Sequence, residues 1–129
     1  MHLRYTILYV DDVTEAIEFY ERAFGLQRRM IHESGDYGEL ATGDTRLSFC
    51  SKELMKQTGK PPGDVDPSAP TFEIAFETEE VAENLKRALR EGATLVQDAQ
   101  EMPWGQTTAY VRDNNGFLVE LCTTVSPQS

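Results

Sequence analysis

The pattern of apolar and polar residues predicts a strand followed by a helix at the start of the chain. Residues 3–10 are rich in β-branched and aromatic side chains, which favour a strand. Asp12, with Glu15 three residues later, resembles the capping box that begins a helix, and Gly25 can end one in the left-handed conformation. The apolar face of this helix repeats at spacings of three and four residues: Val13, Ala16, Ile17, Tyr20, Ala23 and Phe24.

Three short strands are predicted to follow, at residues 26–32, 37–41 and 45–51. Two turn-like segments, 34–36 and 42–44, separate them. The composition of residues 52–70 then becomes polar and rich in proline, which favours neither a strand nor a long helix. We therefore interpret this segment as a connector.

The second half of the chain repeats the same order of elements. A strand is predicted at residues 71–77, Thr78 is a candidate N-cap, and Gly92 can end the helix that follows. The helix carries its apolar face at Val81, Leu85, Ala88 and Leu89. Three more strands are predicted at 94–97, 107–112 and 117–123, with a turn at 113–116 between the last two.

The two halves match at fixed offsets, which indicates an internal repeat. Tyr5 corresponds to Glu73 at an offset of 68 residues, whereas Ser48 corresponds to Glu120 and Cys50 to Cys122 at an offset of 72. The predicted fold class is α+β: two tandem βαβββ units with pseudo-twofold symmetry that form a half-open mixed-sheet cavity. The whole chain, 1–129, forms one domain in this interpretation, with the first unit at about 1–51, the linker at about 52–70 and the second unit at about 71–124.

The net charge and the cysteines of the chain indicate which binding partners and which cellular compartment to expect. The chain has 12 Lys and Arg against 22 Asp and Glu, a net charge of −10, which disfavours nucleic acid and anionic membrane surfaces. No apolar run approaches the roughly 20 residues that span a bilayer. The two cysteines are not in CxxC spacing, and no signal segment opens the chain. We expect a cytoplasmic protein with free thiols.

Three segments of the chain are similar to the vicinal oxygen chelate superfamily, which includes glyoxalase I, extradiol dioxygenases, and fosfomycin- and bleomycin-resistance proteins. The similar segments are Tyr-Thr-Ile-Leu-Tyr-Val-Asp-Asp at 5–12 leading into Ala-Ile-Glu-Phe-Tyr at 16–20, Phe-Gly-Leu at 24–26, and Tyr-Val-Arg-Asp-Asn-Asn-Gly-Phe-Leu-Val-Glu-Leu at 110–121. The resemblance covers residues 3–123. It implies the two-unit fold and a homodimer, but no single activity, because one fold hosts many chemistries.

In metal-using members of that superfamily, four side chains converge on a divalent ion. The resemblance places these positions at Tyr5, Ser48, Glu73 and Glu120, where the family favours His, Gln or Glu. The second unit keeps two carboxylates, whereas the first offers a phenol and a hydroxyl. We therefore expect no tightly bound metal and no cofactor, because zinc-like ions need about three or four good donors.

Several residues are candidates for contact with a ligand. Glu120 shares its strand face with Leu118 and Cys122 and is predicted to face the cavity, the alternative being an ordinary solvent-facing position. Glu73 has the same two alternatives. Tyr5, Ile7 and Tyr9 share one face and are expected to line the pocket, although Tyr9 could equally belong to the core. The set is completed by Ser48, Cys50, Cys122 and Trp104, of which the two cysteines could simply be buried apolar residues and Trp104 could stack on a ligand or pack on a helix or a second subunit.

Three functions follow from these residues. The favoured one is a small-molecule-binding domain that binds or sequesters its ligand without metal, in the manner of bleomycin-resistance-like proteins. The alternative is a divalent-metal-dependent lyase, isomerase or dioxygenase of the glyoxalase type, with the ion held by Glu73 and Glu120. A third is metal-free catalysis, in which two carboxylates raise each other's pKa so that one acts as a general base. Neither His2 nor His32 is a convincing ligand, and the sequence leaves the identity of the small molecule open.

Overall fold

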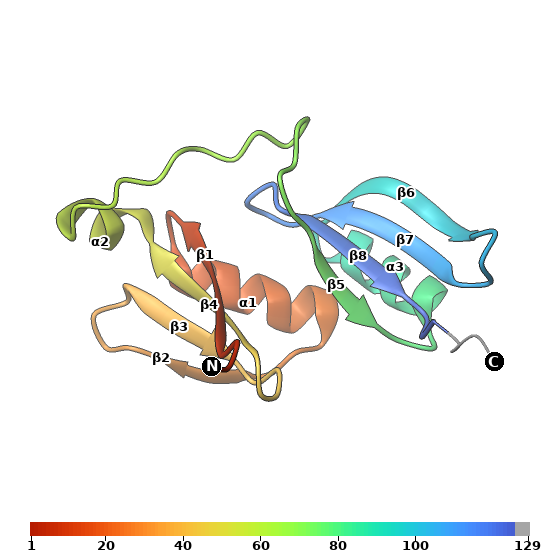
Figure 1. Cartoon of the computed structure of the whole chain (residues 1–129), viewed down its shortest axis with the longest axis horizontal. Coiled ribbons are helices and arrows are strands. Elements are labelled where there is room, and N and C mark those ends of the chain that lie inside the picture. Colours follow the sequence, from red (N-terminus) through yellow and green to blue (C-terminus); the bar gives the residue numbers. More distant parts are fainter. Residues whose placement is uncertain (126–129) are drawn as a thin grey trace. The chain divides into compact units, whose positions relative to one another are not determined.

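Each half of the chain folds into a four-stranded mixed sheet that is covered on one face by a helix (Figure 1). The computed structural model describes residues 1–125. The chain divides into two units, Met1–Asp64 and Val65–Ser129, which are called unit 1 and unit 2 below. No helix within residues 1–125 combines the length and apolar character of a membrane span.

Unit 1 contains four strands and two helices. Its elements are β1 (Tyr5–Val10), α1 (Val13–Phe24), β2 (Arg28–Ile31), β3 (Tyr37–Leu40), β4 (Arg46–Ser51) and α2 (Lys52–Gln57). The strand order is β1-β4-β3-β2, in which β1 and β4 are parallel and the other pairs are antiparallel. Strand β1 is therefore an edge strand next to β4.

Unit 2 repeats this arrangement. Its elements are β5 (Ile74–Glu77), α3 (Val81–Arg90), β6 (Thr94–Glu101), β7 (Thr107–Arg112) and β8 (Leu118–Cys122). The strand order is β5-β8-β7-β6, again with one parallel pair at the β5 edge. The α+β class and the two similar βαβββ halves predicted from the sequence are confirmed.

Helix α1 forms where its capping residues and apolar spacing predict it. The backbone N–H of Glu15 donates to Asp12 Oδ1 at 3.0 Å, and Gly25 ends the helix with φ 69°. Five of the six predicted apolar residues are buried, and Phe19 joins them. The ring of Tyr20 lies 5.2 Å from that of Phe49 on β4, so the apolar face of the helix packs on the sheet.

Three local predictions need correction or extension. A short helix, α2, begins directly after β4, because Ser51 Oγ accepts the backbone N–H of Leu54 and caps it. Thr78 is not the N-cap of α3: Glu80 occupies that position, and Thr78 Oγ1 instead accepts from the backbone N–H of Glu80 and the side chain of Asn84. Strand β6 runs to Glu101, four residues past its predicted end.

The strand registers of the two sheets coincide at the predicted offsets. Ile7 pairs with Ser48 in unit 1, and Ala75, 68 residues after Ile7, pairs with Glu120, 72 residues after Ser48. On the neighbouring pair of strands, Glu39 lies opposite Ser48 and Tyr110 lies opposite Glu120. The internal repeat is therefore a repeat of backbone pairing as well as of element order.

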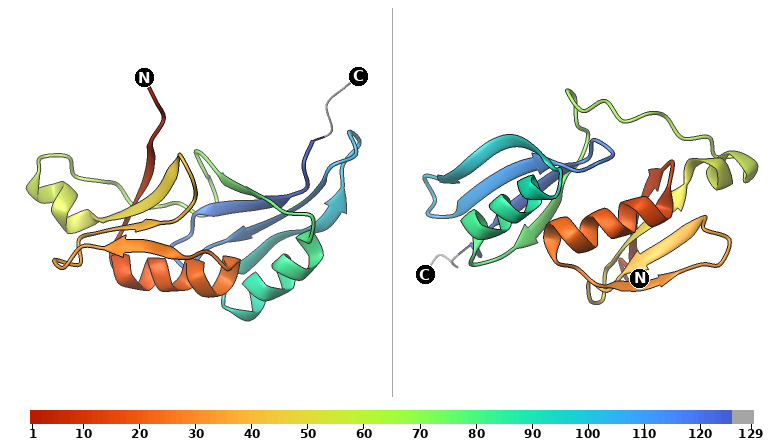
Figure 2. Two further views of the ribbon diagram at one scale, coloured as in Figure 1. Left: turned by 90° about the horizontal axis from the view of Figure 1, so that it is seen from below. Right: turned by 180° about the vertical axis from the view of Figure 1, so that it is seen from behind.

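In each unit, one face of the sheet carries the helix and the other does not (Figure 2). A Cβ atom on Gly38 of β3 would lie 3.1 Å from Val13 of α1, so Gly38 faces the helix, as Phe49 of β4 does. Side chains alternate along a strand. The opposite side, called the helix-free face below, therefore carries these residues of unit 1: Tyr5, Ile7, Tyr9, Tyr37, Glu39, Arg46, Ser48 and Cys50.

Candidate functional site

A buried carboxylate, Glu39, organises the helix-free face of unit 1. Arg29 Nη1 donates to Glu39 Oε1 at 2.8 Å, and the Tyr37 hydroxyl donates to Glu39 Oε2 at 2.7 Å. Arg46 Nη1 lies 3.7 Å from the same Oε1, beyond direct hydrogen bonding. The Glu39 side chain is only 7% exposed, so its charge needs these partners.

Ser48 of β4 lies opposite Glu39 and differs from it in hydrogen bonding. Its hydroxyl oxygen is buried and has no hydrogen-bond partner among the described residues. The hydroxyl lies near enough to Tyr37 to lower the pKa of that phenol, but burial is the larger effect and raises it. A buried hydroxyl without a partner costs roughly 1–3 kcal/mol, so a ligand atom that bonded it would recover this cost.

The neighbouring strand β1 presents a row of apolar side chains on the same face. These side chains are large and at least partly apolar, yet they are exposed: Tyr5 by 45%, Ile7 by 41% and Tyr9 by 37%. Tyr9 is therefore not a core residue, which decides that alternative. The guanidinium carbon of Arg46 lies 6.0 Å from the centroid of the Tyr5 ring, within cation–π range.

The helix-free face of unit 2 carries a pair of carboxylates beside a phenol. The Tyr110 hydroxyl donates to Glu120 Oε2 at 3.0 Å. Glu73 is partly exposed, yet withdrawal of its carboxyl from water raises its pKa, and the nearby Glu120 carboxylate raises it further. Burial also raises the pKa of Tyr110, and the adjacent Glu120 adds to this shift. Glu73 and Glu120 therefore share one environment, in which ionisation of Glu73 is disfavoured.

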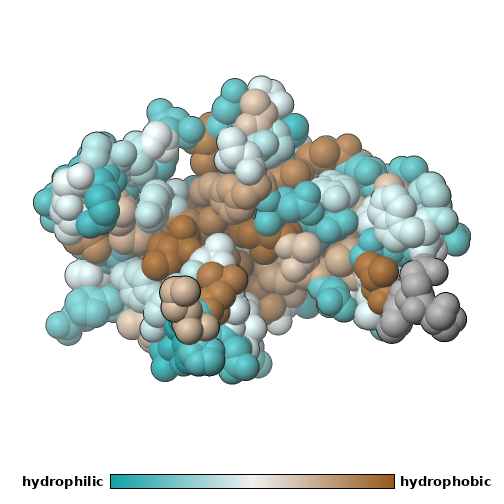
Figure 3. Space-filling model, in the orientation of Figure 1, coloured by the Kyte–Doolittle hydropathy of each residue, from teal (hydrophilic) through white to brown (hydrophobic). Residues whose placement is uncertain are grey.

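The remaining predicted site residues differ in accessibility. Cys50 and Cys122 lie on the helix-free faces of their units but are buried, and burial raises the pKa of both thiols. Trp104 lies in the turn between β6 and β7 and is 56% exposed, with its indole N–H donating to Gln106 at 2.8 Å. Figure 3 shows that hydrophobic as well as hydrophilic residues reach the surface on this face of the molecule.

Sequence reasoning missed Glu39, Arg29, Arg46, Tyr37 and Tyr110. Their importance depends on which residues lie opposite each other across strands, and the pattern along one strand does not specify this. One signal was present in the sequence: Glu39 lies between Gly38 and Leu40, which both face the core, so its own side chain must point to the other side.

Across residues 1–125, no group of three or more His, Cys, Asp or Glu side chains is arranged to hold a metal ion. Tyr5 and Ser48 are the unit 1 residues at which the sequence resemblance predicts the metal-ligand positions of metal-using members. Arg46 lies beside the Tyr5 ring, and Glu39, which is paired with Arg29, lies opposite Ser48. Glu73 and Glu120, at the corresponding positions of unit 2, are the carboxylate pair described above.

The repeated βαβββ architecture defines the class of fold, and comparison with known families names it. Residues 2–121 match the Glyoxalase/Bleomycin resistance protein/Dioxygenase superfamily, and the chain belongs to this superfamily. The resemblance seen in the sequence is therefore confirmed. Among curated proteins, no relative matches the chain.

Solved structures share the fold over nearly the full length. A glyoxalase/bleomycin resistance protein/dioxygenase family enzyme from Burkholderia phytofirmans PsJN is 22% identical, with a TM-score of 0.82 over 98% of this chain and 100% of its own. A glyoxalase-related enzyme from Fulvimarina pelagi is 20% identical, with a TM-score of 0.79 over 95% of this chain and 88% of its own. TioX from Micromonospora sp. ML1 is 24% identical, with a TM-score of 0.71 over 92% and 95%. At these identities the comparison establishes the fold alone.

Proposed function

We propose that this chain is a small-molecule-binding domain that holds its ligand without a metal ion, in the manner of the bleomycin-resistance members of its superfamily. The observation that carries the proposal is the row of Tyr5, Ile7 and Tyr9 on the helix-free face of unit 1. Exposed apolar side chains that gather on one face mark ligand or partner surfaces, whereas scattered ones do not. Beside the row lie polar groups able to orient a ligand, namely Ser48 and Arg46.

The chemistry of the donor set supports binding without metal. In unit 1 the two family positions offer a phenol and a neutral hydroxyl, and a guanidinium lies over the phenol ring. A bound cation would be repelled by Arg46. In unit 2 the family positions offer two carboxylates, Glu73 and Glu120, and the second accepts a hydrogen bond from the Tyr110 hydroxyl. These residues do not fit a resident transition metal, which prefers about three or four deprotonated or lone-pair donors.

A pair of matched variants tests the apolar row. Ile7→Asn should weaken binding of the uncharged dye Nile red about fivefold, because a buried apolar contact worth roughly 1 kcal/mol is lost. Leu95→Asn is the control, since Leu95 is 45% exposed, close to the 41% of Ile7, and lies on the edge strand of the other unit. Fluorescence titration gives both affinities. Equal weakening by the two variants, or no dye binding by the wild type, would contradict the proposal.

Metal content and assembly are tested on untreated protein. Elemental analysis should find no stoichiometric transition metal, and about one tightly held ion per chain would favour the glyoxalase-type metalloenzyme instead. The family resemblance further leads us to propose a homodimer. Light scattering at micromolar concentration measures the mass, and native mass spectrometry shows any small molecule that is retained. A monomeric mass would contradict the dimer while leaving the binding proposal intact.

A further inference from the structure

The guanidinium of Arg46 has unused capacity to bind an anion. Its side chain is 25% exposed, and it makes no side-chain hydrogen bond within residues 1–125. Its nearest charged partner, Glu39 Oε1, is 3.7 Å away and already accepts from Arg29. A guanidinium has five N–H donors in a planar fork that fits a carboxylate.

Ser48 gives a second, independent sign of a missing partner. It lies on the same face of β4 as Arg46, two residues further along. The Arg46 guanidinium lies 3.7 Å from Glu39, and Glu39 is opposite Ser48. The guanidinium and the unpartnered Ser48 hydroxyl therefore lie in the same part of the sheet. An acceptor at this place would satisfy both.

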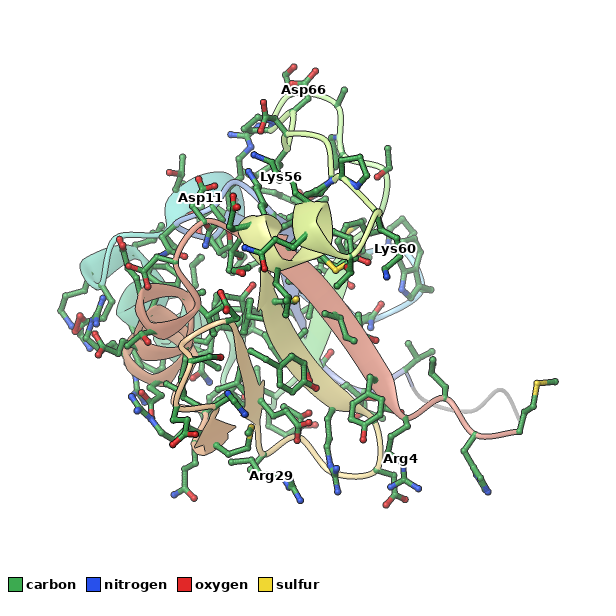
Figure 4. The ribbon with its side chains drawn as sticks, turned by 90° about the vertical axis from the view of Figure 1, so that its left-hand side faces the viewer. Arg4, Asp11, Arg29, Lys56, Lys60 and Asp66 are labelled. Carbon is green, nitrogen blue, oxygen red and sulfur yellow. The ribbon has the colours of Figure 1, made fainter. Side chains whose placement is uncertain are left out.

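The local charge also favours an anion. Arg29 and Arg46 face the single carboxylate of Glu39, which leaves one positive charge in excess. Arg4 and Arg29 lie at the end of the sheet where β1 begins, whereas Lys56 and Lys60 lie at the other end with α2 (Figure 4). Eight of the twelve Lys and Arg residues belong to unit 1, while the 22 acidic residues are divided equally between the units. Unit 1 is thus the less acidic half of a chain whose net charge is −10.

We propose that the helix-free face of unit 1 recognises the carboxylate group of an aromatic acid. Arg46 donates to the carboxylate, the Ser48 hydroxyl provides a further donor, and the row of Tyr5, Ile7 and Tyr9 packs on the aromatic body. This inference rests on the proposed binding function and specifies the chemical class of its ligand.

Benzoate and benzamide, which have nearly the same shape, separate charge from apolar contact. Isothermal titration should give benzoate an affinity about tenfold above that of benzamide, equivalent to one charge-assisted hydrogen bond in a half-exposed site. Arg46→Gln should remove this preference while Arg46→Lys keeps part of it. Arg28→Gln is the matched control, because Arg28 lies in the same unit but is occupied by Glu21 at 2.8 Å. It should leave the preference unchanged.

The Ser48→Ala variant distinguishes a role in binding from a role in stability. Removing a buried hydroxyl that has no partner should not lower the free energy of unfolding, yet it should weaken benzoate binding about threefold. Equal affinities for benzoate and benzamide in the wild type would overturn the carboxylate inference and leave the binding function standing. No binding of either compound would overturn both. A stability loss in Ser48→Ala with unchanged affinity would also remove Ser48 from the site.

Discussion

Replacing Glu39 by Gln should weaken the fold and strengthen anion binding at the same time. The carboxylate accepts two direct hydrogen bonds, from Arg29 and Tyr37, and charge-assisted bonds contribute roughly 1.5–3 kcal/mol each. Gln keeps one carbonyl acceptor, and Arg29 is 48% exposed, so water compensates part of the loss. The expected cost is about 2 kcal/mol, or a fall in Tm of roughly 7 °C for a chain of this length.

Urea denaturation followed by far-UV circular dichroism measures this cost. Glu21→Gln is the matched control: it is the same substitution in the same unit, but Glu21 pairs with Arg28 at the surface and should contribute about 1 kcal/mol or less. In the folded variant, Arg29 and Arg46 no longer share a carboxylate, so benzoate should bind more tightly than to the wild type. If Glu39→Gln costs no more than Glu21→Gln, the buried cluster does not stabilise unit 1 and the reasoning fails.

Three further predictions concern titration, thiol access and packing. The pKa of Glu73 is raised in the folded chain, so its ionisation opposes folding: Glu73→Gln should raise the free energy of unfolding at pH 7, and this gain should vanish as the pH falls through the raised pKa towards 4.5. An equal gain at pH 4 and pH 7 would refute that assignment. Iodoacetamide at pH 8 should modify Cys50 and Cys122 only in denaturant, as mass spectrometry would show, because both thiols are buried. Gly38→Ala should cost about 1–3 kcal/mol in thermal unfolding, since the new Cβ would lie 3.1 Å from a buried side chain of α1; an unchanged Tm would show that the helix yields freely.

The sequence predicted those parts of the fold that local chemistry determines. Helix α1 was predicted correctly because a cap, a repeating apolar face and a terminal glycine all agree on its bounds. The repeat followed from constant offsets, which need no knowledge of strand pairing. Helix α2 was missed because it has only six residues, none of them buried, and therefore no apolar face to detect. Thr78 shows a similar limit: it has the chemistry of a cap, but the helix begins two residues later than that role requires.

The candidate site was predicted less completely than the fold. Tyr5, Ile7, Tyr9 and Ser48 were found through alternation and the family resemblance, and they do share one face. The groups that give this face its charge lie on three different strands and meet only through the register of β3 with β2 and β4. Register depends on contacts between distant segments, so Glu39 with its two arginines could not be deduced from any single run of residues.

The shared register has a consequence for how the two units diverged. Each sheet places one carboxylate and one hydroxyl side by side at the same rung, but in opposite order: Glu39 beside Ser48 in unit 1, and Tyr110 beside Glu120 in unit 2. Moving the acid from the third strand of the unit to the fourth shifts a negative charge by about 4.8 Å, while the third and fourth strands keep the same pairing at this position. In a repeated sheet of this kind, a substitution on one strand can therefore change the chemistry of one copy without changing its backbone. The strand pairing is retained, and only the position of the charge differs.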